Sequence, residues 1–188
     1  DLLIDTYPAI RDPDRLTLVI AGHGPAEERV AALCARYPEI VRAGPMARDE
    51  VAAAMASADL FLALGAHETF SLCTLEALAC GTPVVAAAVG GLPVAVADGV
   101  SGTLVPGHDA GQWADAIAGL LDGDPAALSR GAVEHARQFS WDNTVDALLA
   151  SYGRAIRDYG NSHHRGAARD LAVRRNGRRW VKRRGVRA

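Results

Sequence analysis

The stretch HETFSLCTLEALACGTPVV at residues 67–85 joins a helical pattern directly to a strand-like run, and this junction decides the fold. Residues 71–80 are rich in leucine and alanine, whereas residues 82–88 form an apolar run behind a glycine and a proline. A helix followed at once by a strand is typical of βα units around a parallel sheet. Two carboxylates, Glu68 and Glu76, precede the strand, so the stretch is a candidate site as well as a fold signal.

The same alternation of strand and helix continues on both sides of this stretch. Strand-like runs bounded by Gly or Pro lie at 16–22, 39–44, 59–65, 82–88 and 102–106. Helical patterns lie at 26–37, 48–57, 71–80 and 92–98. Further apolar residues recur at helical spacing behind Asp109 and Ser140, which are expected N-caps. The predicted fold class is α/β, a Rossmann-like parallel sheet flanked by helices with a helical C-terminal end.

The composition favours a soluble protein, which we expect to be cytoplasmic. The chain has 188 residues, of which 49% are hydrophobic. No apolar run reaches the roughly twenty residues that a membrane-spanning helix needs, and no signal peptide opens the chain. Cys34, Cys73 and Cys80 contain no close pair, which predicts reduced thiols and neither a disulfide framework nor a zinc knuckle. We expect Cys73 and Cys80 to pack as small hydrophobes beneath the helix.

The charge distribution predicts two parts, a domain at 1–159 and a basic tail at 160–188. Residues 1–159 carry 10 basic and 21 acidic side chains, whereas residues 160–188 carry 10 basic and one acidic side chain. Three interpretations of the tail stay open: a disordered solvated extension, contact with an anionic membrane surface, or contact with nucleic acid. Membrane contact would place the protein peripherally at the inner face of a membrane. Because the body is acidic, no nucleic acid is expected as a partner.

Ligands of such folds bind outside the carboxyl ends of the strands, so the loops after the strands are the places to search. After the first strand, Gly22 and Gly24 begin a dinucleotide-binding pattern, but Glu27 replaces the third glycine. Glu27 and its neighbour Glu28 would repel a pyrophosphate at this helix start. A tight turn with an exposed His23 is the simpler interpretation.

The loop after the third strand is the opening stretch, where Glu68 falls in the turn and Glu76 lies along the helix. Backbone amides at residues 69–72 would face outward, where they can hold hydroxyl oxygens or phosphates. A carboxylate suits paired vicinal hydroxyls such as those of a ribose or pyranose. The alternative is an ordinary amphipathic helix, with Glu76 in its solvent-facing stripe and Phe70 in the core.

No metal site is predicted from the carboxylates. The two D-x-D triplets, at residues 12–14 and 122–124, lie beside or around prolines in turns. Helix capping explains such triplets better than metal coordination.

The stretch ETFSLCTLEALACGTPVV resembles the E-x7-E signature of GT-B retaining glycosyltransferases of family 4. Other segments agree in the family's order, over roughly residues 1–158. LTLVIAGHGP resembles its second donor-domain strand and turn, and VRAGPM its next strand and base-contacting loop. VGGLPVAVADGVSGTLVPGHD resembles the segment after the signature, and FSWDNTVDALLASY its closing helices.

This resemblance implies a role for each matched residue. Glu68 would face the transferred sugar as the catalytic-site carboxylate, without acting as a nucleophile, and Glu76 would bind the ribose hydroxyls. The implied donor-binding residues are Gly22, Gly24, Ala43, Gly44, Pro45, Met46, Glu68, Thr69, Phe70, Ser71, Leu72 and Glu76. The amides of Thr69 to Leu72 would hold sugar hydroxyls and the diphosphate, and the loop Ala43 to Met46 would lie along the base.

The family also implies the donor and the partners. The donor would be a nucleotide-sugar, UDP- or GDP-linked, without an obligatory metal or other cofactor. The family places before this stretch a strand with a Gly-Arg turn and a Lys that grips the diphosphate, preceded by an N-terminal acceptor domain. We expect the isolated chain, without these, to show little or no transferase activity.

Two other functions remain open, namely a non-catalytic sugar-nucleotide-binding module or degenerate remnant, and a related GT-B enzyme such as an epimerase. One departure from the family pattern concerns the signature itself. Thr69 and Ser71 stand where many relatives have glycine.

Overall fold

The computed structural model describes the backbone of residues 2–10 and 16–180, and the side chains of residues 2–10 and 16–160. The chain divides into two compact units, residues 1–139 and residues 140–188. The first unit contains all the strands of the described chain, and the described part of the second contains one helix.

All strand pairing in the first unit is parallel, as the sequence predicts. The strands are β1 (Leu18–Ala21), β2 (Ile40–Gly44), β3 (Phe61–Ala63), β4 (Val84–Ala87) and β5 (Gly102–Val105). Hydrogen bonds divide them into a two-stranded sheet, β1-β2, and a three-stranded sheet, β3-β4-β5. All four residues of β4 are buried because this strand lies between β3 and β5 and is covered on both faces, which explains its uninterrupted apolar sequence.

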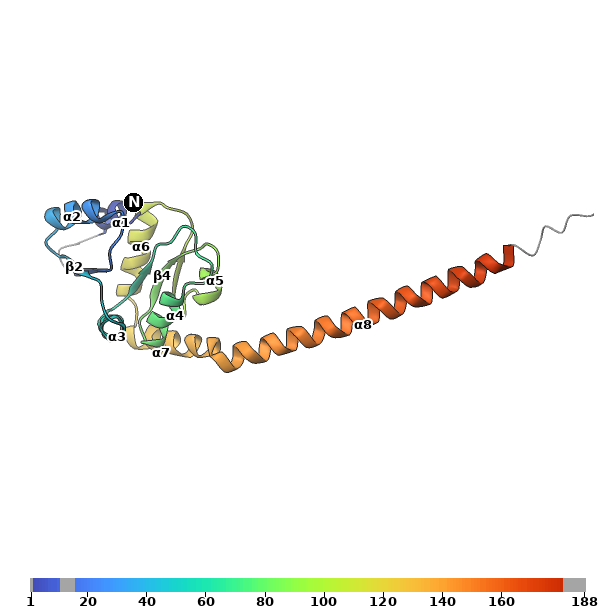
Figure 1. The fold of residues 1–188 in the computed structure, drawn as a ribbon. Helices are drawn as coiled ribbons and strands as arrows, with labels where there is room; N and C mark the ends of the chain where they lie inside the picture. Colours follow the sequence, from blue (N-terminus) through green and yellow to red (C-terminus); the bar gives the residue numbers. More distant parts are fainter. Residues whose placement is uncertain (1, 11–15, 181–188) are drawn as a thin grey trace, which may run out of the picture. The chain divides into compact units, whose positions relative to one another are not determined.

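Helices cover these sheets in the alternating order that the sequence predicts. They are α1 (Leu2–Thr6), η1 (Tyr7–Ala9), α2 (Glu27–Arg36), α3 (Arg48–Ser57), α4 (Leu72–Ala79), α5 (Leu92–Ala95) and α6 (Ala110–Leu121). Helices α4 and α6 both pack against the β3-β4-β5 sheet (Figure 1). Asp109 caps α6, as expected, by accepting a hydrogen bond from the Gln112 amide at 2.9 Å. The same helix fills the core with Trp113, which is fully buried and donates its indole N–H to the Gly107 carbonyl.

Helix α7 (Pro125–Ala136) is missing from the helical patterns identified in the sequence, although helix capping was expected at residues 122–124. Its sequence, PAALSRGAVEHA, is rich in alanine and lacks a clear apolar stripe, so its periodicity is weak. The usable signal was local: Asp124 accepts hydrogen bonds from the amides of Ala126 and Ala127, and Pro125 occupies the first helical position. The triplet at 122–124 is therefore a helix cap, as predicted, whereas the triplet at 12–14 lies outside the described residues.

The second unit contains helix α8 (Trp141–Trp180), the helical C-terminal end that the sequence predicts. Ser140 begins it as expected, since its hydroxyl accepts a hydrogen bond from the Asn143 amide at 3.2 Å. The helix continues past residue 159 into the basic segment, and residues 181–188 lie outside the described residues. The domain boundary at 159 and the disorder of the tail stay predictions. Among the described residues, no helix is both long and apolar enough to cross a membrane.

The expectation for Cys73 is wrong, because its side chain is exposed. The buried side of α4 is formed by Thr74, Ala77 and Leu78, at the i, i+3, i+4 spacing of one helix face. Position 73 lies on another face. Cys80, just after the helix, is half-buried, in line with the expectation.

We predict that Asp124→Ala lowers the free energy of unfolding by about 1 kcal/mol, because two amides at the start of α7 lose their acceptor. Asp122→Ala is the matched control, since Asp122 lies at the end of α6 and not at a helix start. Urea denaturation of both variants measures the difference. Equal stability of the two variants would contradict the cap.

Candidate functional site

The turn between β3 and α4, residues 68–71, is closed by the carboxylate of Glu68. Its Oε1 accepts hydrogen bonds from the amides of Thr69, at 3.0 Å, and Ser71, at 3.1 Å. Glu68 is half-buried, and of the two bonds only that from Ser71 is partly shielded from water, whereas that from Thr69 is exposed. The Glu68 carboxylate, which the sequence predicts to face the sugar, therefore stabilises the loop to which it belongs.

Ser71 adopts a backbone conformation that favours glycine. It is the N-cap residue of α4, with φ +63° and ψ +79°, and it is the one non-glycine residue with positive φ in the described chain. Its hydroxyl does not cap the helix but accepts a hydrogen bond from the hydroxyl of Thr74 at 2.9 Å. Thr74 is fully buried, so this bond satisfies a polar group in the core. The departure from glycine noted at this position thus falls on a strained residue.

The amides of Thr69 and Ser71, predicted to bind sugar hydroxyls and diphosphate, are both engaged by Glu68 in this structure. They already hold an anionic oxygen, which shows that the turn can present them to a negative charge. A ligand that used the same two amides would have to replace the Glu68 oxygen.

Glu76 lies on the exposed side of α4, together with Leu72 and Cys73. Leu72, the first residue of the helix, is 68% exposed. The geometry fits a solvent-facing stripe and also an open binding face, since both require exposure. The assignment of Glu76 to a ribose therefore stays a prediction.

Phe70 is not a core residue, because its side chain is 37% exposed. Its ring meets the Phe139 ring edge-on, with centroids 5.8 Å apart, and Phe139 in turn meets His135 at 5.3 Å. This contact ties the tip of the turn to η3 (Arg137–Phe139), which directly follows α7. The role of Phe139 as a support was not predicted from the sequence.

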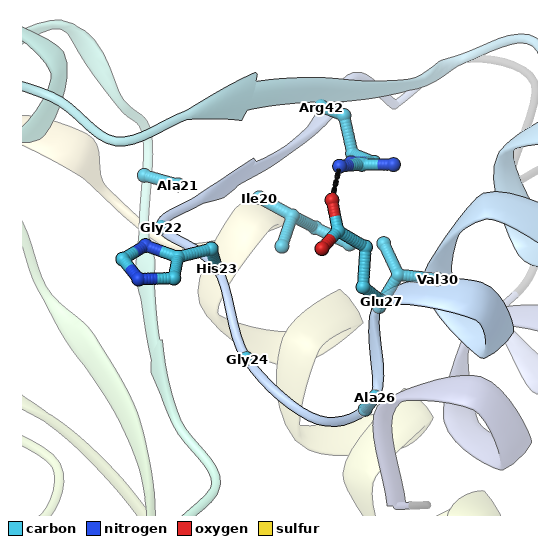
Figure 2. A pocket seen from close by; sticks show the side chains of 9 residues that line it. All are labelled: Ile20, Ala21, Gly22, His23, Gly24, Ala26, Glu27, Val30 and Arg42. Atoms are coloured by element: carbon cyan, nitrogen blue, oxygen red, sulfur yellow. Dashed lines mark hydrogen bonds and ion pairs between the residues drawn. The ribbon is translucent and has the colours of Figure 1, made fainter.

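A pocket lies at the carboxyl end of β1, and it includes both predicted glycines, Gly22 and Gly24. Its lining residues are Ile20, Ala21, Gly22, His23, Gly24, Ala26, Glu27, Val30 and Arg42 (Figure 2). The Gly22 amide donates a hydrogen bond to the Gly44 carbonyl at 2.7 Å, which joins this turn to the predicted loop Ala43 to Met46. The structure thus brings these two groups of predicted residues together.

Arg42 is a pocket residue that the sequence analysis missed. It extends from β2 to Glu27 at the start of α2, where the two side chains form an ion pair (Figure 2). The expected repulsion between Glu27 and a phosphate is therefore reduced, because Arg42 compensates that charge. His23 is exposed, as expected, and its ring points away from the ion pair.

The described residues contain no group of three or more His, Cys, Asp or Glu side chains placed to hold a metal ion. The polar groups at the turn and the pocket include backbone amides, the Ser71 hydroxyl, His23, the carboxylates of Glu27 and Glu68, and the Arg42 guanidinium.

The parallel sheets flanked by helices agree with the Rossmann-like half of a GT-B fold, the class that the sequence resemblance implies. The family model described as glycosyl transferases group 1 matches residues 1–123. The chain belongs to this family, which confirms the resemblance to family 4 drawn from the E-x7-E stretch.

Curated relatives agree with this assignment. The chain is 60% identical over 143 residues to the D-inositol 3-phosphate glycosyltransferase of Mycolicibacterium smegmatis, covering 76% of this chain and 32% of the relative. It is 57% identical over 147 residues to the protein of the same name from Mycobacterium leprae, covering 76% of this chain and 34% of the relative. The chain therefore spans about a third of the length of the curated relatives that it matches.

Solved structures confirm the predicted fold class. The structure of Anabaena HepE in complex with UDP and glucose matches with a TM-score of 0.68 and 25% identity, over 82% of this chain and 44% of that one. The sucrose-phosphate synthase of Thermosynechococcus elongatus matches with a TM-score of 0.65 and 28% identity, over 82% and 42% of the two chains. The similarity extends beyond the residues matched by the family model.

We predict that Ser71→Gly is more stable than Ser71→Ala by about 1 kcal/mol, because both variants lose the hydroxyl but only glycine relieves the positive φ. Thermal and urea unfolding of the two proteins measure the difference. Alanine equal to or better than glycine would show that Ser71 does not hold this backbone conformation in solution.

Proposed function

We propose that this chain is the donor-binding part of a retaining glycosyltransferase that uses a nucleotide-activated sugar. The observation that carries the proposal is the turn at residues 68–71, whose amides hold a carboxylate oxygen at the start of a helix. Such an arrangement suits a diphosphate or sugar hydroxyls. Glu76, on the exposed side of the same helix, would accept hydrogen bonds from ribose hydroxyls.

The pocket beside β1 supports a place for the nucleoside. It is lined by main chain at Gly22 and Gly24, by apolar side chains at Ile20 and Val30, and by the Arg42–Glu27 ion pair. Apolar walls with a few polar groups are typical of sites for small organic ligands. In this proposal the base lies between this turn and the loop Ala43 to Met46, which the bond between Gly22 and Gly44 joins.

The proposed donor is a UDP-sugar, and the proposed acceptor of the whole protein is a phosphorylated inositol. The donor proposal draws on the HepE structure, which is described with UDP and glucose. The acceptor proposal draws on the name of the curated relatives. The acceptor wall would come from the part of the relatives' length that this chain does not match, so the isolated chain would bind donor without transferring the sugar.

In the proposed mechanism Glu68 has two successive partners. Without donor, its carboxylate holds the amides of Thr69 and Ser71. With donor, oxygen atoms of the sugar-diphosphate take over those amides, and the carboxylate turns to the sugar hydroxyls. Glu68 thereby positions the sugar and forms no covalent intermediate.

A binding module without catalysis is the alternative, and it requires the same donor site. Sugar transfer by a whole protein that contains this chain distinguishes the two functions, since only a transferase shows turnover.

We predict that UDP-sugars raise the melting temperature of the chain and that Glu76→Ala removes most of this effect. Ligand at one hundred times its dissociation constant stabilises a fold by about 2.7 kcal/mol. Losing hydrogen bonds to a charged acceptor weakens binding by about ten- to a hundredfold. A thermal-shift screen of UDP-, GDP- and ADP-sugars measures both effects.

Asp115→Ala is the control for this screen, because Asp115 is an exposed carboxylate on α6, away from the turn. It should respond to each nucleotide like the unsubstituted chain. No stabilisation by any nucleotide-sugar, or equal stabilisation of the Glu76→Ala variant, would contradict the assigned site.

We further propose that residues 160–188 contact an anionic membrane surface, which would place the protein at the inner face of a membrane. The support is the charge of this segment, with 10 basic residues and one acid. Basic segments gain about 1 kcal/mol for each Lys or Arg near an anionic surface.

We predict that the full chain sediments with anionic vesicles and that residues 1–159 alone do not. Neutral vesicles and high salt should abolish the sedimentation of the full chain, because the attraction is electrostatic and is screened. Vesicle sedimentation followed by gel analysis measures the bound fraction. Equal binding by the two proteins would contradict membrane contact through the basic segment.

A further inference from the structure

The backbone of Gly90 and Gly91 lies directly against the carboxylate turn. These residues follow β4 and precede α5. The Gly91 amide donates a hydrogen bond to the Glu68 carbonyl at 3.2 Å. The two segments are neighbours in space, although more than twenty positions separate them in the sequence.

The approach is so close that neither glycine has room for a side chain. A Cβ at Gly90 would lie 1.7 Å from the Glu68 carbonyl oxygen, and Gly90 also has φ +55°. A Cβ at Gly91 would lie 2.2 Å from the Thr69 carbonyl oxygen and 2.8 Å from the Phe70 Cα. Each clash is with main chain, which cannot move aside as a flexible side chain can.

We propose that Gly90 and Gly91 are positioning residues for the donor, acting through the Glu68–Ser71 turn. This inference rests on the proposed function and deepens it. The Glu68 carboxylate holds the turn through hydrogen bonds within the loop, and the main chain of the two glycines packs against the main chain of the turn. The segment behind them is anchored, because Leu92 is fully buried.

A side chain at either position would push the turn away from the glycines, and its amides would move with it. Hydrogen bonds weaken steeply with distance and angle, so a displaced turn would hold the sugar-diphosphate poorly. The nucleoside would be affected less, because its proposed contacts come from the pocket beside β1, from the loop after β2 and from Glu76. Loss of this support therefore predicts a selective defect in binding the sugar-diphosphate.

The test compares Gly91→Ala with Gly131→Ala, which creates an equally close clash elsewhere. A Cβ at Gly131 would lie 2.2 Å from the Val100 carbonyl oxygen, in the packing of α7. Neither glycine has positive φ, so both substitutions introduce the same steric conflict without backbone strain. Both variants should melt at lower temperatures than the unsubstituted chain.

We expect Gly91→Ala to weaken UDP-glucose binding by about tenfold or more, the effect of losing well-placed charge-assisted hydrogen bonds. Uridine binding should change by less than about twofold on the same scale. Gly131→Ala should leave both affinities unchanged at a temperature where it is folded. Calorimetry for UDP-glucose and ligand-observed NMR for uridine provide these constants.

Hydrogen exchange of the unsubstituted chain supplies a second measurement that does not depend on the folding of a variant. Saturating UDP-glucose should slow exchange at the Gly91 amide together with that at Ser71, because the two segments act as one unit. Unchanged exchange at Gly91, or equal loss of UDP-glucose and uridine binding in Gly91→Ala, would overturn the positioning role. If the unsubstituted chain binds UDP-glucose and Gly91→Ala binds it equally well, only this inference fails. If the unsubstituted chain binds neither ligand, the proposed function fails and the inference fails with it.

Discussion

The local structure of the candidate site depends on one interaction, the hydrogen bonds from the amides of Thr69 and Ser71 to the Glu68 carboxylate. A chain leaving β3 must reverse sharply to begin α4, and the first amides of a helix have no partner within the helix. An N-cap serine usually solves this problem with its own hydroxyl. Here the Ser71 hydroxyl does not cap the helix but accepts a hydrogen bond from the buried Thr74, and the Glu68 carboxylate accepts from the Ser71 amide just before the helix.

Backbone strain accompanies these hydrogen bonds at one residue. Ser71 has positive φ, while its amide donates to the Glu68 carboxylate and its hydroxyl accepts from Thr74. Strain of this kind persists only where the surroundings over-determine the conformation. The close approach of Gly90 and Gly91 and the Phe70–Phe139 contact provide that surrounding structure. The turn is therefore held by the segment after β4, by η3 and by its own carboxylate.

The sequence predicted the elements of the fold better than it predicted the supports of the site. Every strand falls within a predicted apolar run, and the run is uninterrupted at β4 because this strand is buried along its whole length. The range of helix α7 was not identified, because its alanines favour a helix without showing which face is buried. The locations of Glu68 and Glu76 followed from the spacing of the E-x7-E stretch. The hydrogen bonds of Glu68 did not, since a carboxylate that accepts from its own turn has no periodic signature.

Contacts between distant segments were beyond sequence reasoning for a physical reason. In the sequence, the pair Gly90–Gly91 is typical of an ordinary turn. Glycine can indicate that there is no room for a side chain, but it does not indicate which atoms occupy that space. Only the fold shows that the excluding atoms are the main chain of residues 68–70. The ion pair of Arg42 could not be predicted either, since nothing in the sequence of β2 indicates that this side chain reaches the Glu27 carboxylate.

The placement of these contacts connects stability with binding. A turn held by hydrogen bonds within one loop could keep its shape even if it drifted relative to the sheet. Packing of main chain against main chain removes that freedom, because neither partner can adapt by rotating a side chain. The glycines thus fix the position of the turn relative to β4, whereas the Glu68 carboxylate fixes its internal geometry. If the Glu68 carboxylate leaves the amides to bind a sugar, the hydrogen bonds within the turn are lost on binding. The packing of the turn against Gly90 and Gly91 remains. In the proposed mechanism, the restraint that would remain during donor binding is thus the one built from main chain alone.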